Sequence, residues 1–420
     1  MRARVGCLSL LVFSTLFAVT PQAAAQAGQL DPTFGTGGIV TTDFGIHTSS
    51  GNLASANAAV LQSDGKIVVA GGVPGSNGFP IVAVARYNTN GSLDTSFGNS
   101  GIATTSSIED APFTSVALQA DGRIVAVAGG FSAFVVRYTS AGVLDSTFGT
   151  GGIVDLSEIN GPAQSGVAIQ PDGKILVADN RLFRLLSNGQ FDTSFGSNGG
   201  AFAAAYPSTG LALLPNGEIL VSSSGGASGF LSQYQSNGAL DTTFGIAGQL
   251  ATPGTAAGLV LPGSGDFVAT GTLTNNSIRS NGVSSSGFAV SRYLSQGITD
   301  ASFGTNGGTT TMVPNYLMVA TSSAGLEPSG DVVVAGTGST TRTSAFALAR
   351  YTASGQLDTT FGNNGTVVTT FGGGITVPSV TANGLAIQSD GKIVVVGGYS
   401  VFVAHQGFDT AFKVARYLAQ

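Results

Sequence analysis

The stretch GSLDTSFG at Gly91–Gly98 decides the fold, because close copies of it recur along the whole chain. Copies begin at Gly142, Gly189, Gly238, Gly297 and Gly355, and a shorter copy, QLDPTFG, begins at Gln29. Two other phrases keep step with it, LQSDGKIVVAG from Leu61 and VARY from Val84, and each phrase occurs seven times. Repetition at this spacing indicates a repeat architecture.

Each repeat predicts four β-strands. An Asp-Gly pair between two apolar runs, as at Asp64 and Gly65, is the preferred two-residue turn of a β-hairpin. The second strand is apolar on both faces, which indicates burial between neighbouring sheets. The third strand ends at the phrase and the fourth follows it, and no helical periodicity appears after the first 27 residues. We therefore expect an all-β, seven-bladed β-propeller of four-stranded blades.

The segment 28–420 is expected to form a single domain. Its blades fall at roughly 55–104, 114–155, 165–205, 208–252, 256–313, 320–371 and 382–417. The last of these has only three strands, and residues 38–43 are expected to supply the fourth. Such an N-terminal strand would close the propeller and remove an open sheet edge.

Each residue of the phrase has a physical role. The Asp accepts hydrogen bonds from backbone amides two residues on, the Phe fills the wedge between blades, and the Gly permits a tight reversal. The Arg of VARY recurs in six units, with Gln233 in the other, and is expected to pair with the Asp at the blade base. The structural repeat residues are Asp31, Phe34, Arg86, Asp94, Phe97, Arg137, Asp145, Phe148, Arg184, Asp192, Phe195, Asp241, Phe244, Arg292, Asp300, Phe303, Arg350, Asp358, Phe361 and Arg416.

The three phrases together resemble the delta-60 repeat family, over residues Leu30–Tyr417. That resemblance implies a secreted β-propeller of unknown activity and supplies no catalytic residues. The second-strand phrase is also loosely similar to that of the NHL propellers. Units three and five depart from the pattern, with LFRLLSNGQFD and LPGSGDFV, which bears on local blade shape and not on the fold.

The first 27 residues resemble a secretory signal peptide. Arg2 and Arg4 precede an apolar run, and small residues around Ala25 offer cleavage sites. Cys7 is the only cysteine, so the mature chain would contain none, and we expect it to be extracellular or periplasmic. The net charge of −6, with only 9% charged residues, disfavours nucleic-acid binding. No later segment is long and apolar enough to span a membrane, and we expect a monomer.

Candidate site residues are those that remain after the repeat is subtracted, because loops that differ between units carry function. Five acids belong to loops expected on one face: Glu109, Asp110, Asp155, Glu158 and Asp179. They could form a solvated acidic rim or hold Ca²⁺ through oxygen ligands, and no other cofactor is indicated. Tyr316 and Tyr399 could stack on sugars, together with Tyr206, Asn275, Asn276 and Asn315, although exposed loop aromatics are common.

A second group, His47, His405 and Asp409, is expected near the closing blade. Two imidazoles and a carboxylate could hold a transition metal, but they lie in long loops without ligand spacing.

No nucleophile elbow, zinc-protease motif, cysteine cluster or phosphate-binding loop occurs in the sequence. We therefore expect a secreted, non-catalytic binding or scaffold module whose variable loop face binds an extracellular glycan or protein. Two alternatives remain open. One is a glycan-active hydrolase or lyase that uses the loop-face carboxylates, and the other is a purely structural surface protein.

Overall fold

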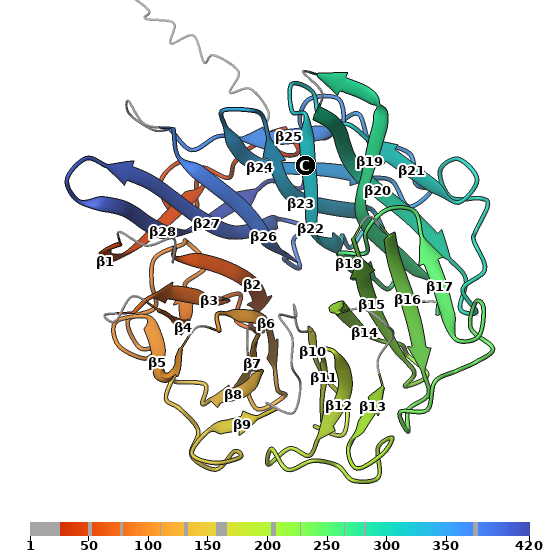
Figure 1. Ribbon diagram of the computed structural model, residues 1–420. Helices are drawn as coiled ribbons and strands as arrows, with labels where there is room; N and C mark the ends of the chain where they lie inside the picture. Colours follow the sequence, from red (N-terminus) through yellow and green to blue (C-terminus); the bar gives the residue numbers. More distant parts are fainter. Residues whose placement is uncertain are drawn as a thin grey trace, which may run out of the picture.

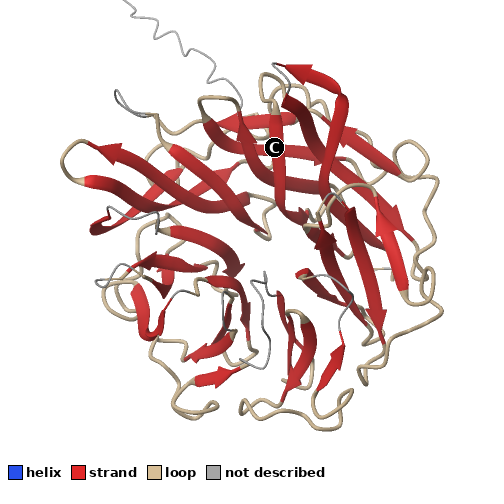
Figure 2. Cartoon of the chain, viewed as in Figure 1, coloured by secondary structure: helices blue, strands red, loops and turns tan. Residues whose placement is uncertain are grey.

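The computed structural model describes residues 26–48, 53–75, 79–109, 111–129, 133–156, 166–202, 207–226, 228–263, 265–280, 283–372 and 377–420. These residues form strands joined by turns and loops, with no helix among them (Figure 2). Accordingly, the described segments include no helix with the length and hydrophobicity needed to cross a membrane. The all-β class predicted from the repeat is confirmed.

We number the repeat units one to seven in chain order. Units one and two contain β2 (Ser55–Leu61), β3 (Ile67–Pro74), β4 (Pro80–Tyr87), β5 (Ile102–Glu109), β6 (Phe113–Leu118), β7 (Ile124–Ala128), β8 (Phe134–Tyr138) and β9 (Ile153–Asp155). Units three and four contain β10 (Gly166–Ile169), β11 (Ile175–Ala178), β12 (Arg181–Leu185), β13 (Gly200–Phe202), β14 (Ser208–Leu213), β15 (Ile219–Gly225), β16 (Ser228–Tyr234) and β17 (Gln249–Thr252). Units five and six contain β18 (Gly258–Val260), β19 (Phe267–Ser280), β20 (Val283–Tyr293), β21 (Gly308–Thr311), β22 (Met318–Leu326), β23 (Val332–Ser339), β24 (Ser344–Tyr351) and β25 (Thr366–Thr369). Unit seven contains β26 (Ser379–Ile387), β27 (Ile393–Val403) and β28 (Gly407–Tyr417), beside β1 (Ile39–Thr48).

The strands of each unit pair antiparallel in a four-stranded meander. Units two to six form separate four-stranded sheets, such as β6-β7-β8-β9. Units one and seven share one eight-stranded sheet, because Ser55 of β2 bridges Gly398 of β27. Each unit therefore keeps the four-strand pattern that its sequence predicts.

The strand β1 comes from the N-terminal end of the chain and pairs with β28 near the C-terminal end. The pairing runs from Ile39 to Thr48, with a shift of register after Asp43. The predicted outer strand at residues 38–43 is therefore longer in the structure.

The sheets lie around a common centre with their first strands innermost (Figure 1). Each first strand contacts that of the next unit, in the order β2, β6, β10, β14, β18, β22 and β26, and β26 contacts β2. This radial arrangement of four-stranded sheets is that of a β-propeller.

The second strand of each unit lies in the hydrophobic core. All eight residues of β3 and all five of β7 are buried. Alternate side chains of a strand point to opposite faces, so such a strand must be covered on both sides. Neighbouring units supply that cover, as the apolar run in the sequence predicts.

The Phe of the phrase fills the space between adjacent units. Phe148, at 0% exposure, packs with Val125 and Val127 of unit two and with Ile175 and Val177 of unit three. The seven phrase phenylalanines are all buried: Phe34, Phe97, Phe148, Phe195, Phe244, Phe303 and Phe361. Burial of one such side chain is worth about 1.5–3 kcal/mol of transfer free energy.

An Asp–Arg pair fixes the phrase at the base of the unit. In unit two, Arg137 Nε donates to Asp145 Oδ2 at 2.9 Å, and the guanidinium lies 4.5 Å from the centroid of the Phe148 ring. The other oxygen of Asp145 accepts hydrogen bonds from the amide and hydroxyl of Thr147, at 3.1 and 2.6 Å. The Arg137 guanidinium also donates to the main-chain carbonyl of Ser187, in unit three. One arginine thus connects its own phrase to the neighbouring unit.

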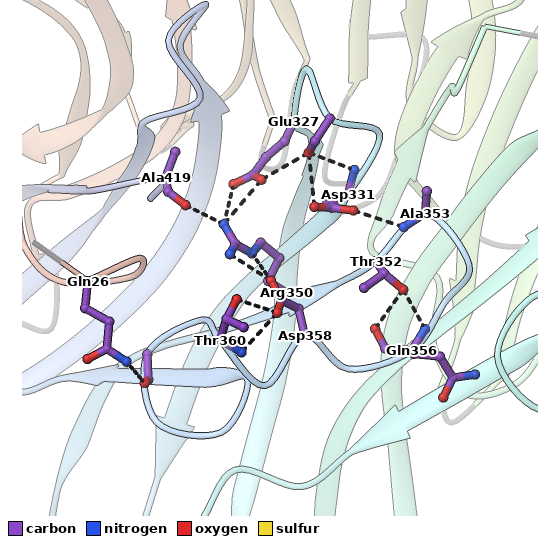
Figure 3. Close-up of polar contacts among 12 residues, drawn as sticks. Gln26, Glu327, Asp331, Arg350, Thr352, Ala353, Gln356, Asp358, Thr360 and Ala419 are labelled. Carbon is purple, nitrogen blue, oxygen red and sulfur yellow. Dashed lines mark hydrogen bonds and ion pairs between the residues drawn. The ribbon is translucent and has the colours of Figure 1, made fainter. Parts of the chain in front are cut away.

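Six described units carry this arrangement, which we call the base node. Figure 3 shows the node of unit six, in which Arg350 contacts Asp358, the carbonyl of Ala419 and the carboxylate of Glu327. The six Arg–Asp pairs are Arg86–Asp94, Arg137–Asp145, Arg184–Asp192, Arg292–Asp300, Arg350–Asp358 and Arg416–Asp31. The pairing predicted from the repeat is therefore present in the units that have the arginine.

Unit four has a glutamine in place of the arginine, and this glutamine pairs with a different carboxylate. Its Gln233 donates to Glu218 Oε2 at 2.5 Å. The carboxylate of Asp241 still accepts the amide and hydroxyl of Thr243, at 3.0 and 2.7 Å. The turn of the phrase therefore forms without the arginine, which shows that the Asp has a local role of its own.

The node of unit seven joins the two ends of the described chain. Arg416, in β28, donates to Asp31 Oδ2 at 2.9 Å and to the carbonyl of Thr89 at 2.6 Å. The first copy of the phrase also includes Gly28, which the shorter sequence match from Gln29 leaves out. Gly28 has φ +81° and packs against Phe361 of unit six, where a Cβ atom would clash.

The electrostatics of the nodes favour ionised carboxylates. Burial opposes ionisation of Asp145, but hydrogen bonds from Thr147 and the charges of Arg137 and Arg123 outweigh it and lower its pKa to about 2. The hydroxyl of Ser96, followed by the nearby amide and cations, lowers the pKa of Asp94 well below its usual range. The phrase aspartates of the six nodes all have lowered pKa values and are therefore charged at neutral pH.

Replacement of Arg137 by Met tests the base node, because it keeps the length of the side chain and removes the charge. We expect the free energy of unfolding to fall by about 2–4 kcal/mol, since buried Asp145 would keep only the half-exposed Arg123 as a cationic partner and the bond to the Ser187 carbonyl would be lost. Urea denaturation measures this loss. Arg342→Met is the matched control, because Arg342 is exposed, and should change stability by less than about 0.5 kcal/mol. Equal stability of both variants would contradict the role given to the node.

Candidate functional site

The two ends of the propeller differ in chemistry. The hairpin turns and the phrases share the base, as the contact of Lys66 Nζ with Asp94 Oδ2 at 3.1 Å illustrates. The segments that lead into the first strands share the opposite end, which we call the loop face. The charged side chains of the base pair with one another, which leaves the loop face as the place for a binding site.

A cavity of about 690 Å³ lies at the loop-face end of the first strands. Its lining residues carry hydroxyl, amide or small apolar side chains: Asn57, Pro112, Thr114, Pro207, Ser208, Thr209, Ser224, Thr255, Ala256, Ala257, Ala320, Thr321, Ser322 and Asn383. No charged side chain belongs to that described lining. The cavity is therefore a polar but uncharged space, which we call the channel mouth.

Register shifts in the first strands mark the polar residues of the channel mouth. The shifts fall at Asn57, Thr114, Thr209, Ser322 and Asn383, each between two residues that pair regularly. A β-bulge leaves one residue out of the ladder and redirects its side chain. Units one, two, four, six and seven thus each present one polar side chain to the same cavity.

Sequence reasoning did not find these residues, although a signal for them exists. Each stands five residues before a fixed repeat position, as Asn57 stands before Gln62 and Asn383 before Gln388. A polar residue at a constant offset before a fixed repeat position is the signal that these bulges leave in the sequence.

The two asparagines also join neighbouring units. Asn383 Nδ2 lies 2.8 Å from Ser55 Oγ and 3.0 Å from the carbonyl of Ala56, in unit one. Asn57 Nδ2 donates to the carbonyl of Phe113, in unit two, at 2.8 Å. Because these amides are held by the neighbouring strand, the wall of the channel mouth is preorganised.

The structure does not bring the predicted acidic residues together as one described group. Glu109 and Asp155 are exposed at the ends of β5 and β9, and Asp179 is buried beyond β11. Asp110 and Glu158 lie outside the described residues. Within the described ranges, no group of three or more His, Cys, Asp or Glu side chains could hold a metal ion. The Ca²⁺ prediction therefore gains no support from the described acids.

The predicted sugar-stacking tyrosines pack against protein. Tyr316 is half-buried against the core between units five and six and touches Gly338, and Tyr399 packs in the core between units six and seven. Asn315 is exposed in a turn with φ +66°. Tyr206 and the side chains of Asn275 and Asn276 lie outside what the structure describes.

The predicted metal group is only partly assembled. His47 of β1 and Asp409 of β28 are opposite each other in the strand pairing. His405 lies in the turn between β27 and β28, with φ +66°. The three side chains do not form a metal-binding group. The reason is geometric, since a turn at the tip of a hairpin projects beyond the ladder that pairs the other two residues.

Asp179 has an unusual environment for a carboxylate. It is 1% exposed, and its Oδ1 has no hydrogen-bond partner among the described residues. Burial raises its pKa to about 6, and the amide of Asn180 offsets this only in part. The hydroxyl of Ser208, which lines the channel mouth, donates to the main-chain carbonyl of Asp179. The buried acid thus lies beside the wall of the cavity.

A family model agrees with this architecture. The model described as a domain of unknown function (DUF5122) β-propeller matches residues 62–97, 119–148, 170–195, 327–361 and 388–420, less than half of the chain. Four of these segments run from the repeat hairpin to the phenylalanine of the phrase. The match supports a β-propeller repeat family. No curated protein matches the chain.

Solved structures similar to the chain belong to several kinds of protein. The WD40 repeats of RRP9 have a TM-score of 0.48 and 10% identity, covering 90% of this chain and 99% of that one. The α-L-arabinanase of Penicillium chrysogenum, complexed with arabinobiose, has a TM-score of 0.41 and 11% identity, over 71% of this chain and 91% of the enzyme. A mutant NanB sialidase from Streptococcus pneumoniae has a TM-score of 0.42 and 8% identity, over 92% and 71%. The similarity concerns the fold alone.

Replacement of Asp179 by Asn tests the environment of the buried acid. The pKa of Asp179 is higher in the folded state than in the unfolded state, so the protonated side chain stabilises the fold. This contribution is fully present below the unfolded pKa and is lost as the pH rises through about 6. We therefore expect the gain in the free energy of unfolding from Asp179→Asn to be about 2 kcal/mol larger at pH 7 than at pH 4. Urea denaturation at the two pH values measures the difference.

The control for this prediction is Asp172→Asn at the exposed base. The hydrogen bond from Lys174 lowers the pKa of Asp172, so its ionisation stabilises the fold mainly above its unfolded pKa, and the effect of Asp172→Asn should change little between pH 4 and pH 7. The same pH dependence for both variants would contradict the environment described for Asp179.

Proposed function

We propose that the protein is a secreted, non-catalytic binding module that takes an uncharged, hydroxyl-rich ligand, such as a neutral glycan, at the channel mouth. The observation that carries the proposal is the lining of the cavity. Its polar groups are hydroxyls and amides from five or more units, without a charged side chain. Hydroxyl-rich ligands need hydrogen-bond donors and acceptors of this kind, and a volume of about 690 Å³ suits a ligand of a few sugar units.

We infer further that the propeller has seven blades and is closed by β1. Support comes from hydrogen bonds in which the last Gly of one phrase donates to a carbonyl of the next unit. The described chain has seven such bonds: Gly35 to Asn90, Gly98 to Ala141, Gly149 to Asn188, Gly196 to Asn237, Gly245 to Gln296, Gly304 to Ser354 and Gly362 to Ala27. The last bond returns to the N-terminal phrase, so the set has no open end. A closed ring would give the channel mouth a complete wall.

Secretion is proposed from the sequence, because residues 1–25 lie outside the described structure. An extracellular or periplasmic location agrees with a mature chain that lacks cysteine, and it would bring the channel mouth into contact with extracellular glycans or proteins. We propose that the module acts as a monomer, with its two faces free.

A hydrolase or lyase acting on glycans is the second candidate. Asp179 is the feature that favours it, because a carboxyl with a pKa near 6 could act as a general acid. The mechanism would also need a second carboxylate within about 5–10 Å, and the pKa of Asp179 is set by burial and the Asn180 amide without a contribution from another acid. The binding module therefore remains the better supported proposal.

Calorimetric titration of the mature protein with neutral tetrasaccharides of glucose, mannose, xylose and arabinose tests this function. Saturable binding is expected for at least one of them. Ser322→Trp should weaken it at least tenfold by filling the cavity, and Asn383→Ala should weaken it by removing the amide that joins the wall to Ser55 and Ala56. The control is Asn363→Ala in an exposed turn of the base, which should leave binding unchanged.

Two results would contradict the proposal. Binding that survives Ser322→Trp would place the site elsewhere, and the absence of binding to every sugar would favour a structural protein. Release of reducing ends that is abolished in Asp179→Asn would instead establish the enzyme.

A further inference from the structure

A second cavity, of about 620 Å³, lies where β1, β28 and the end of β25 meet. It is lined by Lys413 together with Thr41, Thr370, Phe371, Asn90 and Ser92, and by backbone of several glycines. No acidic side chain belongs to this described lining. In contrast to the channel mouth, the cavity therefore has one charged group, and that group is a cation.

Lys413 is not required by the repeat. It directly precedes the VARY phrase of unit seven, at a position where most other units carry an apolar residue. The equivalent residues are Ala83, Phe134, Arg181, Phe230, Ala289 and Ala347. A lysine at an apolar position costs solvation free energy, so its presence needs a reason beyond the fold.

The surroundings of Lys413 satisfy its ammonium group only in part. The residue is 9% exposed, and Nζ donates to Thr41 Oγ1 at 2.6 Å. Nζ also lies 4.3 Å from the ring centroid of Tyr399 and 5.5 Å from that of Phe371, within the range of cation–π attraction. An ammonium has three donors, and the described structure engages one of them in a hydrogen bond.

A counter-ion in contact with Lys413 is missing from the described residues. The node arginines and the base cations Lys66, Arg123, Lys174 and Lys392 each contact a carboxylate. For Lys413 the acid that acts on its charge is Asp409, at long range. Burial lowers the pKa of Lys413, and the charge of Asp409 opposes that effect without cancelling it. A buried ammonium group without a counter-ion in contact is stabilised by any anion that can reach it.

We propose that this cavity binds the oxyanion group of a small molecule, a carboxylate, sulfate or phosphate, through Nζ of Lys413. The hydroxyls of Thr41 and Thr370 and the neighbouring glycine backbone face the same space and can accommodate the remaining oxygens and any attached polyol. The aromatic rings of Tyr399 and Phe371 hold the ammonium in place, so the charge is preorganised for the ligand. The site is separate from the channel mouth and does not depend on the function proposed for it.

Titration calorimetry with sodium sulfate, sodium phosphate and sodium glucuronate, at constant ionic strength, tests the proposal. Glucose is the neutral comparison. We expect saturable binding of at least one anion and none of glucose. Preference for glucuronate would identify an acidic sugar, whereas preference for sulfate or phosphate would identify an esterified or inorganic anion.

Two variants locate the site. Lys413→Met keeps the side-chain length and removes the charge, and should weaken anion binding at least tenfold. Thr370→Glu adds a carboxylate from an exposed position in the lining, and should weaken it equally without disturbing the packing of Lys413. Lys174→Met, at the base, is the matched control and should bind like the parent protein.

If Lys413→Met does not fold, the anion binding of Thr370→Glu alone tests the proposal. The proposal is overturned if the parent protein binds none of the three anions. It is equally overturned if a folded Lys413→Met or Thr370→Glu variant binds them as the parent does.

Discussion

The pair of Asp and Arg side chains at the base of every unit except unit four is the interaction on which the rest of the structure depends. A guanidinium taken out of water must satisfy its donors, and Arg137 does so with the Asp145 carboxylate, the Thr147 hydroxyl and a carbonyl of the next unit. These bonds fix the phrase, the ring of Phe148 and the neighbouring turn relative to one another. The node holds this packing in place, and the packing sets the angle between adjacent sheets. The same geometry recurs in every unit that has both the phrase and the arginine.

Because the structural ion pairs lie at the base, the loop face can carry residues with other chemical roles. Charges gather at the base, where they neutralise one another, and the channel mouth carries hydroxyls and amides. Residues such as Asn57 and Ser322 reach the cavity because a bulge turns them out of the strand ladder, at little cost to the core beneath. One unit contributes one such residue, so the chemistry of the cavity can change unit by unit while the base stays constant. Lys413 illustrates a different departure, in which unit seven places a cation at a position where five of the other units carry an apolar residue and unit three carries Arg181.

Much of the fold could be predicted from the sequence, because local rules govern it. The phrase around Asp94 and Phe97 predicts a turn and a wedge, and the alternation with VARY predicts the Arg–Asp pair. The candidate site was harder to predict from the sequence, because it depends on which strand ends come together in the folded protein. Sequence grouped His405 with His47 and Asp409, but a turn at a hairpin tip separates it from them. The burial of Asp179 and the bulge at Asn383 also arise from tertiary contacts, which a composition argument cannot resolve. The contact of Gly28 with Phe361 is also tertiary, because the two residues are distant in sequence.

The most direct test of the account compares Asp31→Asn with Asp145→Asn in urea denaturation. Asp145 lies in a node built from one continuous stretch of chain, whereas Asp31 meets Arg416 across the two ends. If the nodes hold all units in one ring, both variants should unfold in a single cooperative transition, with losses of stability that agree within about 1 kcal/mol. A loss for Asp145→Asn with no change for Asp31→Asn would show that the terminal node does not hold the structure together, and would contradict the account.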